Sequence, residues 1–518
     1  MLNTAAQTSP PVETGLGLER HAAALERFLE RHQAWVLALW SVVYFGGTMV
    51  RARAYPFWYD EILALLEARQ PTVAAAIGAL RDADWMPPAH HVVLYLTDKL
   101  LGHGEVAFRI PAMIGFWVFS ICLFVFARRR VGVVFALLAM LLPYASSFQA
   151  YSFEARSYAF VLGFGGIALV SWQAATAGIG RPWSLVGLAL GIAGAVAFHY
   201  WAVLIYLPLG GAELYRTVRQ RRIDWPVWAA MLAGGLSLAA SLYPILQGLQ
   251  SWSPHGAQVH RRMYWNFYRI EFRVFYAFAI PAAALLAAWF LLGGRKEQPA
   301  EARRTAIPDY EWVAAVLFLL IPVAAISIAL ASPHQVFALR YAALTVTGYA
   351  LLVSFVAARL AERRSAIGVA CVVAALAPFT YLITHPEYNP NPPEPTESLR
   401  RALEKETVVS DILVPQFVEI WYYLPDSLKP RFVTLSPTGA DEKEWPFLGE
   451  FAKIGVPVGA YRDFAIPGKT FLLYTWRHGD FEKMMASQGA TMEPVASTRR
   501  YRLVRVHSAD QATPRVIP

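Results

Sequence analysis

The chain has 518 residues, of which 56% are hydrophobic and 16% are charged, and its formal net charge is +9. Soluble globular proteins are about half apolar and a quarter charged, whereas the apolar excess here falls in runs of roughly twenty residues, the length that crosses a bilayer. This pattern excludes a soluble globular protein. It also accounts for the positive charge without a nucleic-acid partner, because most basic residues stand in short loops between the apolar runs.

The N-terminal segment, 1–33, is polar and amphipathic. It lacks a small-residue cleavage site after a short apolar core, so we expect a cytoplasmic segment followed by a retained membrane anchor. The two cysteines, Cys122 and Cys371, both lie inside apolar runs. This placement predicts inert core thiols and implies neither a disulfide framework nor a zinc site.

The apolar runs predict about eleven transmembrane helices in a domain over 34–384. They are expected at 34–50, 106–127, 131–148, 157–176, 183–199, 201–215, 227–247, 273–292, 311–331, 341–358 and 366–384. Basic clusters follow the second, sixth, eighth and tenth of these segments, at 128–130, 216–222, 295–304 and 359–364. By the positive-inside rule these loops face the cytoplasm. The opposite face then receives the long first loop, 51–105, and everything after about residue 385.

The composition changes at residue 385, where a proline-rich linker begins. Short β-like runs follow at 408–414, 431–435, 470–474 and 501–506. Helix-like runs alternate with them at 416–423, 443–453 and 481–488. This alternation predicts a small extracytoplasmic α/β domain with a mostly parallel sheet over 385–518. The predicted fold class is therefore an α-helical polytopic membrane protein with a small C-terminal α/β domain.

The long first loop contains two helical patterns. Apolar residues recur with helical spacing over 61–80, and a second amphipathic run, 89–101, follows Pro87-Pro88. Proline is favoured in the first turn of a helix. We therefore expect two helices that lie along the membrane surface.

Asp60 and Glu61 stand at the start of this loop, just past the first predicted span, and follow Trp58 and Tyr59. Aromatic residues of this kind favour the headgroup layer. One carboxylate of the pair is suited to act as a general base or to bind a divalent cation. The alternative is a solvated acid that caps the following helix.

Polar residues gather on the predicted outer face, where their desolvation is costly and usually serves function. Arg156, before the fourth span, and Arg340, at the start of the tenth, are suited to bidentate phosphate binding. The alternatives are an interfacial salt bridge for Arg156 and snorkelling for Arg340. A metal bound by His90 or His91 is left open. Further residues expected at the site are Tyr59, Asp84, His90, His91, Glu154, Tyr158, His199, Tyr200, His334 and Tyr341.

Four of these motifs, in this order, resemble the GT-C glycosyltransferases that use polyprenyl-phosphate sugars. The motifs are Asp60-Glu61 after the first span, Pro87-Pro88 later in that loop, Glu154-Ala155-Arg156-Ser157-Tyr158 before the fourth span, and Arg340-Tyr341 at a late span. The nearest group is glycosyltransferase family 39, with protein O-mannosyltransferases, aminoarabinose transferases of lipid A and rhizobial galacturonosyltransferases. The resemblance covers about 34–384. Met86 departs from it, because relatives often carry His or Lys before the Pro-Pro pair, and so do His90 and His91.

The resemblance implies a polyprenyl-phosphate-linked sugar donor and an extracytoplasmic glycan, lipid A or protein acceptor. It implies that Asp60 deprotonates the acceptor hydroxyl, with Glu61 in support, and that the anomeric carbon is inverted. Arg156, Arg340 and Tyr341 would bind the donor phosphate. The implied location is the bacterial inner membrane. A transporter or flippase, or a non-catalytic component of polysaccharide assembly, remains the alternative; the first of these predicts paired halves with ionisable residues at mid-membrane.

Overall fold

The computed structural model describes residues 14–83, 86–239, 259–274, 276, 307–332, 337–361, 364–385, 396–436, 451–476, 479–498 and 500–509. The chain forms two compact units. Unit 1 holds the described residues up to Arg51, from Ala112 to residue 239 and from 259 to 385. Unit 2 holds the described residues of Ala52–Pro111, which are all but 84 and 85, and the described residues from 396 onward.

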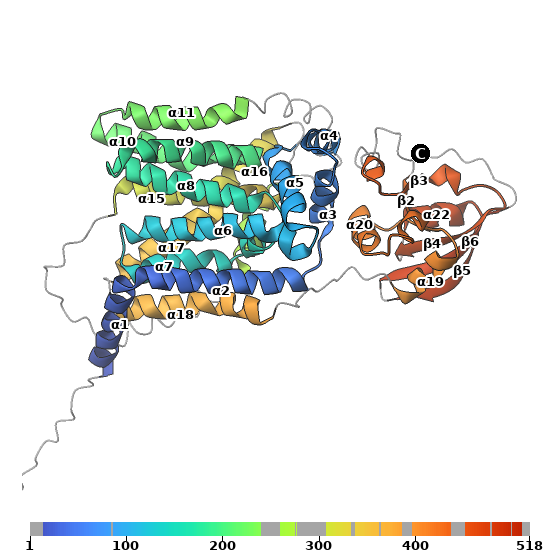
Figure 1. The fold of residues 1–518 in the computed structure, drawn as a ribbon, viewed down its shortest axis with the longest axis horizontal. Helices are drawn as coiled ribbons and strands as arrows, with labels where there is room; N and C mark the ends of the chain where they lie inside the picture. Colours follow the sequence, from blue (N-terminus) through green and yellow to red (C-terminus); the bar gives the residue numbers. More distant parts are fainter. Residues whose placement is uncertain are drawn as a thin grey trace, which may run out of the picture. The chain divides into compact units, whose positions relative to one another are not determined.

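Unit 1 is a bundle of helices, many of which lie side by side in Figure 1. Five helices of the described chain are long and apolar enough to cross a membrane: α2 (Gln33–Ala54), α6 (Glu105–Arg128), α8 (Tyr158–Thr176), α9 (Arg181–Phe198) and α18 (Ser365–Thr384). The first turns of α6 and the last turn of α2 are assigned to unit 2. The protein is thus a multi-pass membrane protein, as its composition predicts.

The other predicted spans of unit 1 correspond to shorter or broken helices. They are α7 (Val133–Leu141) with the 3-10 turn η1 (Leu142–Ala145), η3 (Tyr200–Ile205), α10 (Tyr206–Gln220), α11 (Trp225–Ala239), α15 (Asp309–Leu319), α16 (Ile321–Ala331) and α17 (Thr345–Leu360). The 3-10 turns η2 (Ser147–Ser152) and η4 (Leu339–Ala342) lie at the ends of predicted spans, and α13 (Met263–Glu271) lies between the spans predicted at 227–247 and 273–292. Proline explains two breaks, because its ring prevents a regular helical hydrogen bond. Pro143 lies where α7 gives way to η1, and Pro322 lies where α15 and α16 meet at a 47° bend. The segment predicted at 273–292 lies almost wholly outside the described residues.

Small residues let the membrane helices approach one another closely. A Cβ atom built at Gly163 of α8 would lie 2.6 Å from the carbonyl oxygen of Gly115 on α6. Only glycine fits such a backbone contact, which is typical of helix packing in membranes. The contact fixes α8 against α6 just after the segment that carries Arg156.

An ion pair with a buried carboxylate joins helices at one end of unit 1. Arg130, which follows α6, donates from Nε to both oxygens of Glu311 at 2.9 and 2.8 Å, and Glu311 on α15 is fully buried. Gln173 of α8 donates to the same carboxylate at 3.3 Å. A buried charge is tolerated only when it is paired and hydrogen-bonded, and Glu311 satisfies both conditions.

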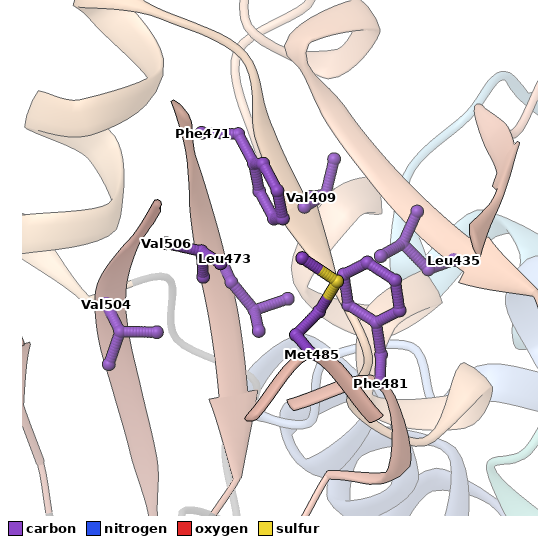
Figure 2. Packing of buried hydrophobic residues seen from close by; sticks show 8 residues of the cluster. All are labelled: Val409, Leu435, Phe471, Leu473, Phe481, Met485, Val504 and Val506. Carbon is purple, nitrogen blue, oxygen red and sulfur yellow. The ribbon is translucent and has the colours of Figure 1, made fainter. Parts of the chain in front are cut away.

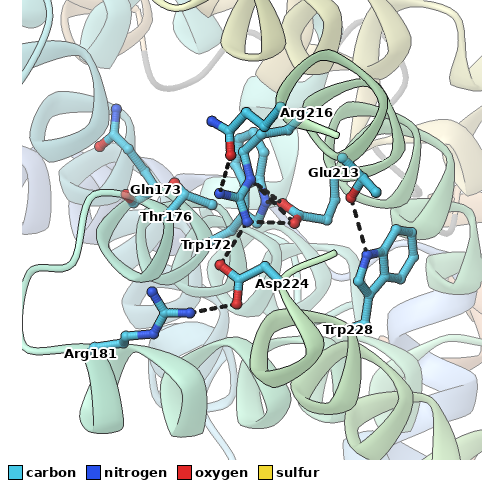
Figure 3. Close-up of polar contacts among 10 residues, drawn as sticks. Trp172, Gln173, Thr176, Arg181, Glu213, Arg216, Asp224 and Trp228 are labelled. Atoms are coloured by element: carbon cyan, nitrogen blue, oxygen red, sulfur yellow. Dashed lines mark hydrogen bonds and ion pairs between the residues drawn. The ribbon is translucent and has the colours of Figure 1, made fainter. Parts of the chain in front are cut away.

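A second charged network lies at the same end, because Trp172 and Gln173 are neighbours on α8 (Figure 3). Trp172 donates from its indole nitrogen to buried Glu213 at 3.0 Å. Arg216 donates to Glu213 at 2.6 Å and to Asp224 at 2.8 Å, and Asp224 also accepts from Arg181. Helices α8, α9, α10 and the start of α11 are thereby joined at their ends.

The N-terminal helix α1 (Thr14–Arg31) attaches to the last membrane helix at the same end. Glu19 accepts hydrogen bonds from the backbone amides of Ser365 and Ala366 at 2.7 and 3.1 Å, and Glu26 accepts one from the Ser365 hydroxyl. These amides belong to the first turn of α18, where a carboxylate is favoured by the helix dipole. The described part of the segment predicted at 1–33 therefore forms a helix that packs on α18.

Unit 2 begins with three short helices: α3 (Tyr59–Ala68), α4 (Val73–Ala83) and α5 (Ala89–Leu101). The helical pattern over 61–80 therefore forms two helices, where the sequence predicted one. Pro71 lies in the break, and the residue before a proline disfavours helical geometry. Helix α5 begins after Pro87-Pro88, as predicted.

The rest of unit 2 is a six-stranded sheet with strand order β3-β2-β1-β4-β6-β5. Its elements are α19 (Glu397–Lys405), β1 (Val408–Ser410), α20 (Val414–Tyr422), η5 (Lys429–Arg431), β2 (Phe432–Ser436), β3 (Val458–Ala460), η6 (Tyr461–Asp463), β4 (Thr470–Trp476), α22 (Asp480–Ser487), β5 (Thr491–Ser497) and β6 (Tyr501–His507). Strands β1 to β4 pair in parallel, and β6 pairs with β4 and β5 in antiparallel fashion. The prediction of a small C-terminal α/β region is confirmed.

One hydrophobic core cluster holds the sheet and α22 together (Figure 2). Its buried members are Val409, Leu435, Phe471, Leu473, Phe481, Met485, Val504 and Val506. Phe481 and Met485 are four residues apart on α22, which places them on one face of that helix. The face packs against alternate residues of the strands, and this fixes α22 on the sheet.

Candidate functional site

The predicted site residues fall into both units. Unit 2 contains Tyr59, Asp60, Glu61, His90 and His91. Unit 1 contains Glu154, Arg156, Tyr158, His199, Tyr200, Arg340 and Tyr341. Asp84 and His334 lie outside the described residues.

Asp60 lies in the first turn of α3 and is buried. The helix begins here because Trp58 is extended and because two carboxylates favour the positive end of the helix dipole. Glu61 also accepts a hydrogen bond from the Trp58 amide at 3.4 Å. Glu61 thus contributes to fixing the first turn that carries Asp60.

Glu61 forms a fully buried ion pair with Arg109 of α6. The guanidinium donates from Nε to Oε1 at 2.8 Å and from Nη2 to Oε2 at 2.6 Å. It also donates to the carbonyl oxygens of Ala52, Tyr55 and Pro56 at 2.7, 2.6 and 3.1 Å. Arg109 therefore organises the chain that leads into Asp60.

A second buried contact fixes the other end of α3. Glu67 and His91 of α5 approach within 2.6 Å, measured from Oε2 to Nε2, and both are buried. His90 is also buried, with its ring centroid 5.5 Å from that of His91. Within the described chain, no three His, Cys, Asp or Glu side chains form a group that could hold a metal ion. The contact between Glu67 and His91 joins α3 to α5.

In unit 1, two predicted cations act on one buried histidine. His199 lies between α9 and η3, and its ring centroid is 5.3 Å from that of Tyr158 and 4.9 Å from that of Tyr341. Arg340 lies over the ring of Tyr341, with Cζ 6.0 Å from the centroid. Burial, followed by the charges of Arg156 and Arg340, lowers the pKa of His199 to about 3. The fold thus brings the two arginine motifs to one place.

The His199 ring is held in one tautomer and stays neutral. Its Nδ1 accepts a hydrogen bond from the Trp201 amide at 3.2 Å, so the proton resides on Nε2. Nε2 is buried and has no hydrogen-bond partner among the described residues. A neutral N–H beside two cations is chemically suited to donate to an anionic oxygen.

His199 predicts a pH-dependent stability. The pKa of this histidine is 6.5 in the unfolded chain and about 3 in the folded protein, so the unfolded chain binds more protons between these two pH values. The free energy of unfolding therefore falls as the pH drops from 6.5 towards 3. At pH 5 this amounts to about 2 kcal/mol. We expect His199→Gln to reduce the difference in thermal unfolding midpoint between pH 7 and pH 5.

The matched control is His385→Gln, because that side chain is exposed. It should leave the pH difference as in the wild type. An unchanged pH difference in His199→Gln would contradict the assignment.

Three residues that contact or lie near the predicted site residues were not predicted from the sequence. Arg109 pairs with Glu61, and Glu67 contacts His91. Glu271 is the last residue of α13, and burial raises its pKa to about 7. Glu271 also contributes, with Tyr158 and Glu154, to a raised pKa of Tyr151, which burial dominates. Arg109 could have been found from the sequence as a charged residue inside an apolar run. Glu67 could have been found because it lies seven residues after Asp60, which places both on one face of a helix.

No protein-family model and no curated protein matches the sequence. Two crystal structures of ArnT from Cupriavidus metallidurans are similar to the chain. The apo structure has 15% sequence identity and a TM-score of 0.46 over 94% of this chain and 100% of that chain. The structure bound to undecaprenyl phosphate has 14% sequence identity and a TM-score of 0.44, over 93% of this chain and 99% of that chain.

Proposed function

We propose that the protein is an integral-membrane glycosyltransferase that transfers a sugar from a polyprenyl-phosphate donor to an extracytoplasmic acceptor. The observation that carries the proposal is the gathering of Arg156 and Arg340 beside neutral, buried His199. Two arginines and a ring N–H suit the phosphate of a lipid-linked donor, because charge-assisted hydrogen bonds from a guanidinium match phosphate oxygens. The four GT-C motifs in the sequence support the same activity.

In the proposed reaction, Asp60 takes the proton of the acceptor hydroxyl. The oxygen then attacks the anomeric carbon, the bond from that carbon to the phosphate oxygen breaks, and the configuration is inverted. Polyprenyl phosphate leaves with the bonding electrons, and Arg156 and Arg340 stabilise its charge. Glu61 acts through Arg109, and Tyr341 packs beside the phosphate-binding arginines.

The remaining predicted residues would surround the sugar and the acceptor. They are Tyr59, His90, His91, Glu154, Tyr158, His199 and Tyr200. We place the protein in the bacterial inner membrane, with the basic helix ends towards the cytoplasm according to the positive-inside rule. The acceptor would be a glycan, lipid A or a protein on the opposite side.

The proposal is tested by restoring the gene to a strain that lacks it and measuring the envelope by mass spectrometry. The wild-type chain is expected to add the mass of one sugar to an envelope glycan, lipid or protein. Arg156→Ala and Arg340→Ala are each expected to lower the modified fraction by about 10²-fold, because one lost charge-stabilising group costs that much in comparable sites. The proposal fails if wild-type protein adds no sugar.

The matched control is Arg261→Ala, which removes an exposed arginine of the segment before α13. This variant is expected to modify the envelope as the wild type does. Equal activity of Arg156→Ala, Arg340→Ala and the control would remove the two arginines from the phosphate site.

A further inference from the structure

The sheet region of unit 2 contacts the segment that precedes Asp60. Helix α20 packs against α3. The Phe57 amide donates to the hydroxyl of Tyr423, just after α20, at 2.6 Å, and the rings of Phe57 and Tyr422 lie 6.1 Å apart. The Tyr59 amide donates to Oε1 of Glu419, on α20, at 3.0 Å. The backbone amides of Phe57 and Tyr59 are therefore both hydrogen-bonded to side chains about 360 residues further along the chain.

Glu419 supplies a cap that α3 does not supply itself. The first amides of a helix have no intrahelical partner. The N-cap residue before α3, Trp58, makes no side-chain cap hydrogen bond, and Glu61 of α3 accepts from the Trp58 amide, not from that of Tyr59. A carboxylate is the favoured partner at this end of a helix, since it also meets the positive end of the dipole. The Tyr59 amide is the first of α3, directly before Asp60 in the chain. Glu419 thus fixes the backbone one residue from the proposed base.

The contact is partly buried and electrostatically linked to Asp60. Burial raises the pKa of Glu419, the Tyr59 amide opposes this, and the nearby charge of Asp60 raises it further. The hydroxyl of Tyr423 also donates to Glu105 at 3.4 Å, at the first residue of α6. Tyr423 therefore connects the Phe57 backbone to the start of the helix that carries Arg109.

We propose that Glu419 and Tyr423 are positioning residues for Asp60, so that the C-terminal α/β region forms part of the catalytic unit. Glu419 holds the first amide of the catalytic helix, and Tyr423 holds the backbone two residues before it. The inference rests on the proposed function, because it assigns these residues to the base of that reaction. It assigns the C-terminal region a role in the chemical step, beside any role in acceptor choice.

The test combines sugar transfer in the gene-deleted strain with deuterium uptake of the purified full-length protein. Glu419→Ala is expected to increase deuterium uptake in peptides over 55–68 and to lower the modified envelope fraction by about 10- to 100-fold, because small misplacements of a catalytic group cost this much. Glu419→Gln keeps an amide oxygen that accepts from Tyr59 and is expected to restore most of both values. Tyr423→Phe is expected to increase uptake in the same peptides.

The control is Glu404→Ala, which removes an exposed carboxylate from α19 of the same unit. It should match the wild type in uptake and in modification. If Glu419 served only general stability, Glu419→Ala would raise deuterium uptake across the sheet as well as over 55–68. Glu419→Gln would then not selectively restore the uptake of the 55–68 peptides.

The inference is overturned if Glu419→Ala matches the wild type while Asp60→Ala is inactive, or if Glu419→Gln behaves as Glu419→Ala does. These outcomes leave the glycosyltransferase intact. The proposed function fails by a different result, in which wild-type protein and the Glu404→Ala control add no sugar to the envelope.

Discussion

Replacing Asp60 by asparagine is expected to lower the rate of sugar transfer by about 10²- to 10⁴-fold, the usual contribution of a general base. Asparagine keeps the size of the side chain and its ability to accept hydrogen bonds, but it cannot take a proton from the acceptor at neutral pH. The buried position in the first turn of α3 should therefore be kept. The measurement is the fraction of modified envelope component in the gene-deleted strain, at matched protein levels.

Asp480→Asn is the matched control for this change. Asp480 also lies in the first turn of a helix, α22, but its side chain is 89% exposed. The control removes the same charge from an equivalent helix position and is expected to leave transfer unchanged. If Asp60→Asn transfers sugar at the wild-type rate, Asp60 is not the base.

Breaking the Glu61–Arg109 pair is expected to cause the largest loss of stability. Removing one partner of a fully buried ion pair leaves an uncompensated charge, at a cost of about 3–5 kcal/mol. Arg109→Ala also removes donors from three carbonyl oxygens before α3. We expect a lower midpoint of thermal unfolding in detergent for Arg109→Ala and for Glu61→Ala.

Two further variants separate the charge from the packing. Glu61→Leu combined with Arg109→Met replaces both charges by apolar groups and is expected to recover part of the lost stability, since no buried charge remains. Arg401→Ala breaks the Arg401–Glu397 pair of α19, whose side chains are 73% and 68% exposed, and should leave the midpoint unchanged. Equal midpoints for Arg109→Ala and Arg401→Ala would contradict the structural role of the buried pair.

The fold class was predictable because it depends on apolar runs, whose positions are local properties of the sequence. The helices α2, α6, α8, α9 and α18 lie close to five predicted segments. Helix breaks at Pro71 and Pro322 were not predicted, since a proline permits either a kink or an end and packing decides between them.

Strand β5 was not predicted for a different reason. It lies at the edge of the sheet, most of its residues are exposed, and Pro494 stands beside a bulge in its pairing with β6. Edge strands tolerate proline and need no buried face, so they lack the alternating pattern of an inner strand.

The candidate site was predictable only as far as each motif shows in the sequence. Asp60, Arg156 and Arg340 stand out as charges beside apolar runs. The pairs of residues that hold the Asp60 segment do not stand out as pairs, because Glu61–Arg109 and Tyr59–Glu419 are contacts between residues 48 and 360 positions apart. Such pairs are set by tertiary packing, for which a single sequence carries no local signal.

The ion pair between Arg130 and buried Glu311 links two parts of the bundle that are synthesised far apart in time. Arg130 leaves the ribosome 181 residues before Glu311. Until α15 is present, Arg130 lacks this carboxylate, and its guanidinium is best solvated by water and by headgroup phosphates. Closing the pair then draws α15 against the helices already in place. The late helices are consequently required to complete the early part of the bundle, and a chain released before α15 is made would leave that end open.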